Sequence, residues 1–187
     1  DIGLGIPAEP LFRSSIVEKI KGKVETASVH VDDIVKGIIT PYCKDLDAYV
    51  RFIATCLKDG EKPPTTTELE DFCLNLSTYI YFAGGMCEQL GIRDDISKAV
   101  WKEMYNTARD ESATGTVADK NTQAELQSQH EQLVNVCYSR AYKTMKAKVD
   151  SAQELLSSCK KVLSHRMQEE QLTHMMSNVS KSRREEY

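Results

Sequence analysis

The chain has 187 residues, of which 41% are hydrophobic and 28% charged, and its formal net charge is -4. This length allows one domain with a real core, or a small domain that carries an extended helical arm. The acidic balance excludes a protein that coats nucleic acid by bulk charge, because such domains carry an excess of Lys and Arg. No apolar run approaches the roughly 20 residues that span a bilayer, so we expect a soluble, cytoplasmic protein.

The first third of the chain predicts an arm and then a long or broken helix. Residues 1–13 contain prolines and glycines without a period, which predicts an extended arm. Ser15 and Glu18 have capping-box spacing and predict a helix that continues to about Ile39. Pro41 interrupts that pattern and a second apolar stripe follows, so a kinked helix and a helix pair both fit.

The clearest boundary in the sequence lies at the two prolines of residues 63–64. Thr65 and Glu68 then offer a second capping box, and Gly91 followed by Asp94 predicts a stop and a new N-cap. We expect residues 14–112 to form an N-terminal helical domain. Its last helix, from about residue 95 to 109, is expected to pack into the core through Ile96, Val100, Trp101 and Met104.

A polar turn and one long helix are predicted for residues 113–178. Gly115 is the expected position of positive φ, and Thr116 or Asp119 the expected cap. No Gly or Pro follows Gly115, so we expect a helix from about Asp119 to Met176. Such a helix would span roughly 80 Å, longer than a compact domain of this size is wide. Residues 179–187 are expected to be a basic flexible tail that contains Lys181, Arg183 and Arg184.

An apolar stripe along this helix predicts a packing seam. Its members recur about every 3.67 positions, which favours a straight or slightly right-handed bundle over a left-handed coiled coil. The seam could join copies of the chain, which we favour, or it could pack within one chain. Its residues are Val134, Cys137, Ala141, Met145, Val149, Ala152, Leu156, Cys159, Leu163 and Met167.

The sequence offers no converging catalytic groups. The four histidines are far apart, and no Gly-rich loop resembles a phosphate-binding motif. Six cysteines occur singly and without metal spacing, so we interpret them as reduced apolar residues rather than a disulfide framework. We therefore predict no enzyme, no metal site and no cofactor. The cysteines are Cys43, Cys56, Cys73, Cys87, Cys137 and Cys159.

Basic residues gather on the same long helix, beside two tyrosines. A basic stripe with interleaved aromatics can follow phosphates while bases stack, as proteins that bind single strands do. The alternative is the solvated face of a long helix, with Lys and Arg stems over apolar surface. The candidate nucleic-acid contacts are Arg140, Lys143, Lys146, Lys148, Lys160, Lys161, Arg166, Tyr138 and Tyr142.

Four strings carry a resemblance to a known group of proteins: Tyr105 to Arg109, Gly115 to Lys120, Tyr138 to Lys143 and Lys160 to Met167. Over residues 76–172 the chain resembles small helical accessory proteins of tailed bacteriophages, of the recombination-mediator type. In that group a short helix, a turn and a long basic helix assemble into a ring, which binds single-stranded DNA and helps to load a recombinase. The acidic net charge and the first 65 residues depart from that pattern.

The resemblance implies a non-catalytic accessory protein of recombination or replication in the host cytoplasm. Its expected partners are further copies of itself, single-stranded DNA and other phage proteins. It also implies that the basic residues of the long helix contact DNA and that the apolar stripe is the assembly seam. The alternative hypothesis is a structural or adaptor protein, such as a virion or assembly component, whose long helix binds other proteins.

Overall fold

The computed structural model describes the backbone of residues 9–58, 63–112 and 115–185, and the side chains of residues 18–177 within these ranges. The described chain forms four helices and no strand, which confirms the all-helical class. The helices are α1 (Glu9–Lys58), α2 (Thr66–Glu111), α3 (Val117–Gln127) and α4 (Gln129–Glu185).

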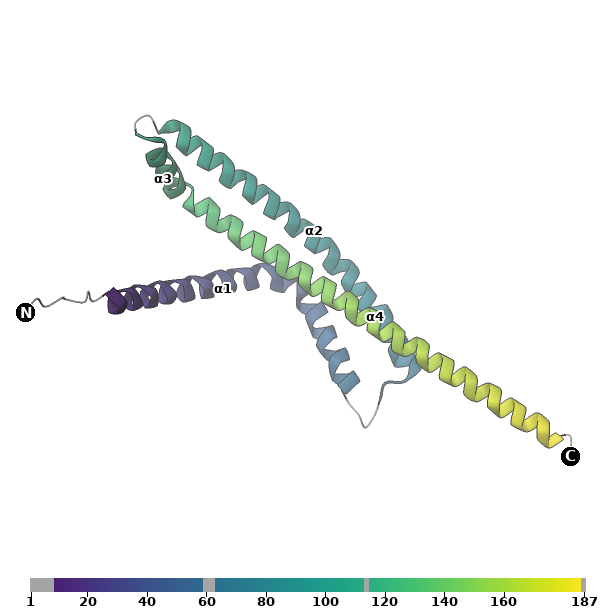
Figure 1. The fold of residues 1–187 in the computed structure, drawn as a ribbon. Coiled ribbons are helices and arrows are strands. Elements are labelled where there is room, and N and C mark those ends of the chain that lie inside the picture. The colour runs from purple at the N-terminus through teal and green to yellow at the C-terminus, as the bar shows by residue number, and fades with distance from the viewer. Residues whose placement is uncertain (1–8, 59–62, 113–114, 186–187) are drawn as a thin grey trace, which may run out of the picture.

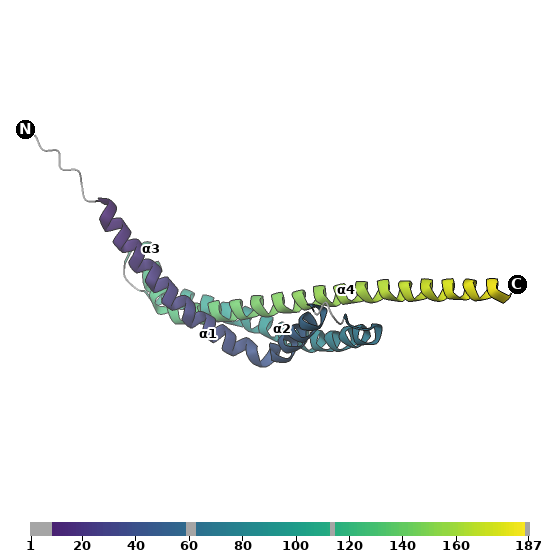
Figure 2. The same cartoon turned by 90° about the horizontal axis from the view of Figure 1, so that it is seen from below.

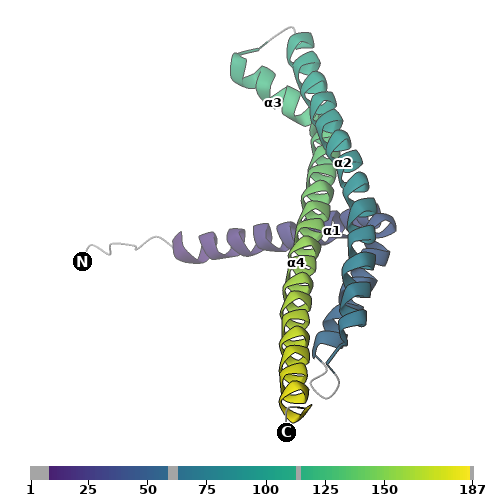
Figure 3. The ribbon, with the colours of Figure 1, turned by 90° about the vertical axis from the view of Figure 1, so that its right-hand side faces the viewer.

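The framework is an antiparallel pair formed by α2 and α4, which lie side by side over most of the length of α2 (Figures 1 and 3). The second half of α1 packs beside this pair, whereas its first half points away from it (Figure 3). The far end of α4 extends beyond the other helices (Figure 2). The molecule is therefore elongated, with two projecting helical segments.

One core joins the three long helices. Its buried side chains come from α1, from the first half of α2 and from the middle of α4, so each helix contributes one apolar stripe. Ile53, Leu76 and Met145 are among the most completely buried residues and represent the three helices. Leu69 and Phe72, whose spacing predicts a buried face on α2, belong to the same core.

Helix α1 is continuous, with Pro41 inside it. Of the two possibilities that the sequence allows, the kinked helix is the one observed, because the ribbon bends in the stretch that contains Pro41 (Figure 1). Two expectations about its start were wrong. The helix begins at Glu9, within the expected arm of residues 1–13, and Ser15 therefore lies inside it rather than at a cap. Residues 1–8 lie outside the described chain.

Helix α2 begins as the sequence predicts but ends later. Thr65 is the N-cap, its hydroxyl accepts from the Glu68 amide, and the Glu68 carboxylate accepts from the Thr65 amide. The expected stop at Gly91 was wrong, because α2 continues through it to Glu111. Asp94 is helical, and its carbonyl oxygen accepts a hydrogen bond from Ser97. Packing along α4 outweighs the low helix propensity of one glycine.

A short helix separates α2 from α4, so the long helix begins about ten residues later than predicted. Gly115 has φ of 120°, the positive value that the sequence predicts, and Thr116 caps α3 with Asp119 in a second capping box. Ser128 then divides α3 from α4, and its hydroxyl bonds back to the Ala124 carbonyl at 2.8 Å. At the other end α4 includes residues 179–185, which were expected to be a flexible tail.

Candidate interaction surfaces

The predicted seam of α4 lies mostly inside the single chain. Its central residues pack against α1 and α2 in the core, and its two ends, Val134 and Met167, are exposed. Leu156 and Leu163 are partly buried against the same core. The buried members are Cys137, Ala141, Met145, Val149, Ala152 and Cys159. The buried middle of the seam is therefore not available to a second copy unless the core opens.

Lys148, predicted as a nucleic-acid contact, is engaged in an ion pair within the chain. Its ammonium group lies 2.7 Å from both carboxylate oxygens of Asp47 in α1. Both side chains are about one-third exposed, at 32% each. The Asp47 carboxylate also accepts a weak hydrogen bond from the Cys43 thiol at 3.5 Å. This pair links α1 to α4, and Lys148 would have to leave it to meet a phosphate.

Tyr142, predicted to stack on bases, packs instead on α2. A methyl group built on Gly91 would come within 3.2 Å of the Tyr142 ring, so a larger residue here would require the ring to shift by a few tenths of an ångström. Tyr138 is also partly covered. About one turn before Tyr138, the side-chain amide of Asn135 donates to the Ser97 hydroxyl of α2 at 3.0 Å. Tyr142 thus belongs to the α2–α4 interface and is not a free stacking surface.

The exposed cations of α4 point in several directions. At about 100° per residue, Arg140 and Lys146 face roughly 120° apart, and Lys143 lies between them. Arg140 lies on the α1 side, where it lines a groove between the two helices. Lys143 and Lys161 share the outer face, where the sequence also places Asp150 and Glu154. The basic residues do not form a single stripe, and carboxylates lie among them.

The remaining predicted contacts lie where α4 passes the start of α2. Lys160 is exposed, and Arg166 is partly buried beside Thr66. The Thr66 hydroxyl donates to the Glu170 carboxylate at 2.6 Å and ties the two helices together here. Acidic side chains therefore lie beside Arg166. Their negative charge lowers the positive potential that a phosphate would meet there.

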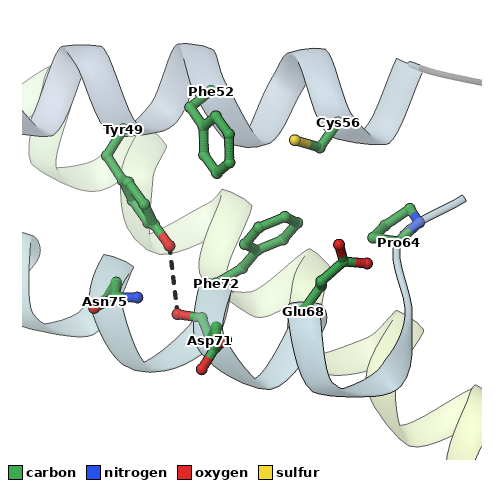
Figure 4. Close-up of a pocket in the computed structure, with 8 residues that line it drawn as sticks. All are labelled: Tyr49, Phe52, Cys56, Pro64, Glu68, Asp71, Phe72 and Asn75. Carbon is green, nitrogen blue, oxygen red and sulfur yellow. Dashed lines mark hydrogen bonds between the residues drawn. The ribbon is translucent and has the colours of Figure 1, made fainter.

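A pocket of about 430 Å³ opens between the end of α1 and the start of α2 (Figure 4). Tyr49, Phe52 and Phe72 form its aromatic wall, and the Phe52 and Phe72 rings meet edge to face at 5.8 Å. The Tyr49 hydroxyl donates to the carbonyl of Asp71 at 3.4 Å, and burial raises the pKa of this tyrosine. The Glu68 carboxylate, on the rim, accepts a hydrogen bond from the Thr65 amide and so takes part in the cap of α2. The pocket is a packing gap of the helical hairpin that would suit an apolar or cationic group.

Three exposed apolar faces are the largest features that sequence reasoning missed. The α1 face consists of Ile20, Val24 and Ala27, which are exposed, and Val31, which is partly buried against the core; the α2 face of Ile92, Ile96, Val100 and Met104; and the α4 end of Leu172, Met175 and Met176. The expectation that Ile96, Val100 and Met104 pack into the core was wrong, because α4 covers the other side of α2. Periodicity reveals an apolar face but does not reveal what covers it.

The α1 face borders a groove of about 540 Å³ between α1 and α4. Val24, Val31 and Val35 line one wall, and Val136 with Arg140 lines the other. The groove forms because the first half of α1 diverges from α4, as Figure 1 shows. Apolar side chains thus face each other across open space.

The six cysteines are free thiols, four of them buried. Burial raises the pKa of Cys43, Cys73, Cys87, Cys137 and Cys159, so these thiols stay protonated at neutral pH. They serve as small apolar residues in the helix interfaces. The described residues hold no cluster of three or more side chains suited to a metal ion.

No described helix combines the length and apolarity needed to cross a membrane. Comparison of the chain with protein-family models, with curated proteins and with solved structures found no match. The resemblance to phage accessory proteins therefore stays a prediction from the sequence.

Proposed function

We propose that this chain is a non-catalytic structural or adaptor protein that joins protein chains through its exposed apolar helix faces. The observation that carries this proposal is the α1 face, which lies on a helical segment that projects from the core and leaves Ile20 and Val24 more than half exposed. Large apolar surface left in water is unfavourable, at roughly 25 cal/mol per Å², so association that covers it is favoured.

Two further features support the same function. The α2 face and the α4 end expose apolar side chains on the outside of the framework, far from one another along the molecule. An elongated helical framework holds such faces apart, which suits a protein that bridges partners. The pocket in Figure 4 is lined mainly by packing residues and presents no paired acid and base.

Sedimentation equilibrium of the full chain over a range of concentrations tests this proposal. We expect the average mass to rise above the 21.1 kDa of one chain as concentration increases. Far-ultraviolet circular dichroism would show whether the helices stay intact over that range. A mass that stays at one chain at every concentration would contradict assembly through these faces.

Binding of single-stranded DNA is the second candidate function, and the exposure of five cations on α4 favours it. We place it second because Lys148 and Tyr142 have partners within the chain and because the other cations face different ways. The exposed cations are Arg140, Lys143, Lys146, Lys160 and Lys161.

A salt titration with a labelled oligonucleotide separates this candidate from the first. If several phosphates are neutralised, affinity should fall steeply, by about 10³-fold or more, between 50 and 200 mM salt. The double variant K143E/K146E should then flatten the slope, whereas K148Q should leave it unchanged. Absence of binding at low salt would eliminate the DNA hypothesis.

A further inference from the structure

We infer that the α1 face docks onto the same face of a second copy of this chain, with the two α1 helices antiparallel. This inference rests on the proposed function and names its partner. An isologous contact of this kind needs a surface that is complementary to itself. The first half of α1 has that property in its shape and in its charge.

The shape of the α1 face permits a close approach. Val24, Ala27 and Val31 line the groove, so the middle of the face carries a small residue between two valines. Small side chains at a helix crossing allow a short distance between the axes. The groove beside the face offers further room, and Val136 on its opposite wall would contact a helix seated there.

The charges along α1 favour the antiparallel direction. Three lysines occupy positions 19–23, and two aspartates occupy positions 32–33. Lys21 and Asp32 are eleven residues apart, which is about three turns, so they lie on the same flank of the α1 face. Antiparallel pairing centred between Thr26 and Ala27 sets Lys21 of each copy opposite Asp32 of the other. Parallel pairing would instead set lysine against lysine and aspartate against aspartate.

Asp32 is already partnered within its own helix, where it lies 2.5 Å from the Lys36 ammonium. Both side chains of that pair are exposed, Lys36 at 65% and Asp32 at 60%, so a further cation can reach the Asp32 carboxylate. The hydrogen bond to Asp32 raises the pKa of Lys36, so the local pair remains charged at neutral pH. A second cation from the other copy would complete a three-member network at each end of the interface.

Substitution of Val24 by Asp tests the face, and Val29 provides a matched control. The two valines are equally exposed, at 57% and 58%, but Val29 lies about 140° around the helix from Val24. We expect V24D to raise the dimer dissociation constant by at least tenfold and V29D to change it by less than threefold, measured by sedimentation. Equal effects of the two substitutions, or none, would overturn the inference.

Charge reversal tests the direction of pairing. K21E and D32K alone should each weaken the dimer about tenfold, and an equimolar mixture of the two variants should restore wild-type association. The control variant D33K reverses the same charge near the back of α1, on the side of Val29, and should have little effect. Single variants that associate as tightly as the wild type would contradict antiparallel pairing.

The outcomes separate the inference from the proposed function. A chain that associates in the wild type and equally well as V24D retains the proposed function but uses another face, such as the α2 face. A chain that remains single at every concentration contradicts both. Rescue by the mixed variants, with no response in the back-face controls, supports the antiparallel α1 contact specifically.

Discussion

At the scale of one residue, a single glycine shows how the size of one side chain affects packing between α2 and α4. Gly91 lies inside α2, where glycine is less favourable than alanine by about 1 kcal/mol. The Tyr142 ring occupies the space that a larger residue would need. Gly85, six residues earlier on the same helix, faces open space instead. Alanine substitutions at the two positions therefore distinguish the effect of helix propensity from the effect of packing.

We expect G85A to raise the free energy of unfolding by about 0.5–1 kcal/mol, because the helix gains propensity and no atom is displaced. G91A should gain less or lose stability, because its methyl group meets the Tyr142 ring at 3.2 Å. Urea denaturation of the two variants measures the difference. Equal stabilisation by both would show that the Tyr142 ring does not pack tightly on α2.

The ion pair between Lys148 and Asp47 gives a second prediction at this scale. Its two 2.7 Å contacts join α1 to α4, and the side chains are partly shielded from water. A double-mutant cycle with K148Q and D47N should yield a coupling energy of about 1 kcal/mol. The same cycle in 1 M salt should give a smaller coupling. Additive single effects would mean that the pair contributes nothing to holding α1 in place.

At the scale of the elements, α3 depends on its cap. It has 11 residues, and isolated helices of that length are marginal in water. Hydrogen bonds from the hydroxyl and the amide of Thr116 lower the pKa of Asp119 below its ordinary value. The stability that Asp119 contributes is therefore present above that ordinary pKa and is lost as pH falls through the lowered one.

Comparison of D119N with the wild type across pH tests this cap. At neutral pH we expect D119N to have the lower Tm, because the amide replaces a charged acceptor at a helix N-terminus. The difference should shrink as pH falls and should vanish once Asp119 is protonated. A Tm difference that is constant from neutral to acidic pH would rule out a charged cap.

Local signals predicted the element boundaries that local chemistry controls. The sequence predicted the break at the prolines of residues 63–64, the caps at Thr65 and Thr116 and the positive φ of Gly115. Proline removes a backbone donor, a cap satisfies the first amides of a helix, and glycine tolerates positive φ. The stop predicted at Gly91 was wrong, since packing along α4 carries α2 through it, whereas Pro41 lies inside a continuous α1, which is one of the two outcomes that the sequence allows.

The surfaces were predicted less well, and the reason is geometric. Spacing identified Ala141 and Met145 as packing residues, but it could not say that α1 and α2 of the same chain would cover them. It also grouped Lys148 with the other cations, because its partner Asp47 lies 101 residues away. Partners that are distant in sequence leave no local pattern, so their effects appear only in the folded chain.

At the scale of the whole molecule, the distribution of apolar surface supports the proposed function. The core occupies the crossing of α1, α2 and α4, while both projecting segments carry exposed apolar residues. A protein that functions as a single chain usually buries such faces or carries polar residues on them. Their retention on rigid helices fits a protein whose structure is completed by other chains.

Amide hydrogen exchange as a function of protein concentration tests this central claim most directly, because it reports which helical segments become protected on association. We predict that exchange along residues 18–31 of α1 slows as concentration rises, while exchange in the buried parts of α2 and α4 stays the same. The α2 face and the α4 end would show further slowing only if they also join chains. Equally fast exchange in α1 at every concentration, with an average mass fixed at 21.1 kDa, would contradict the account.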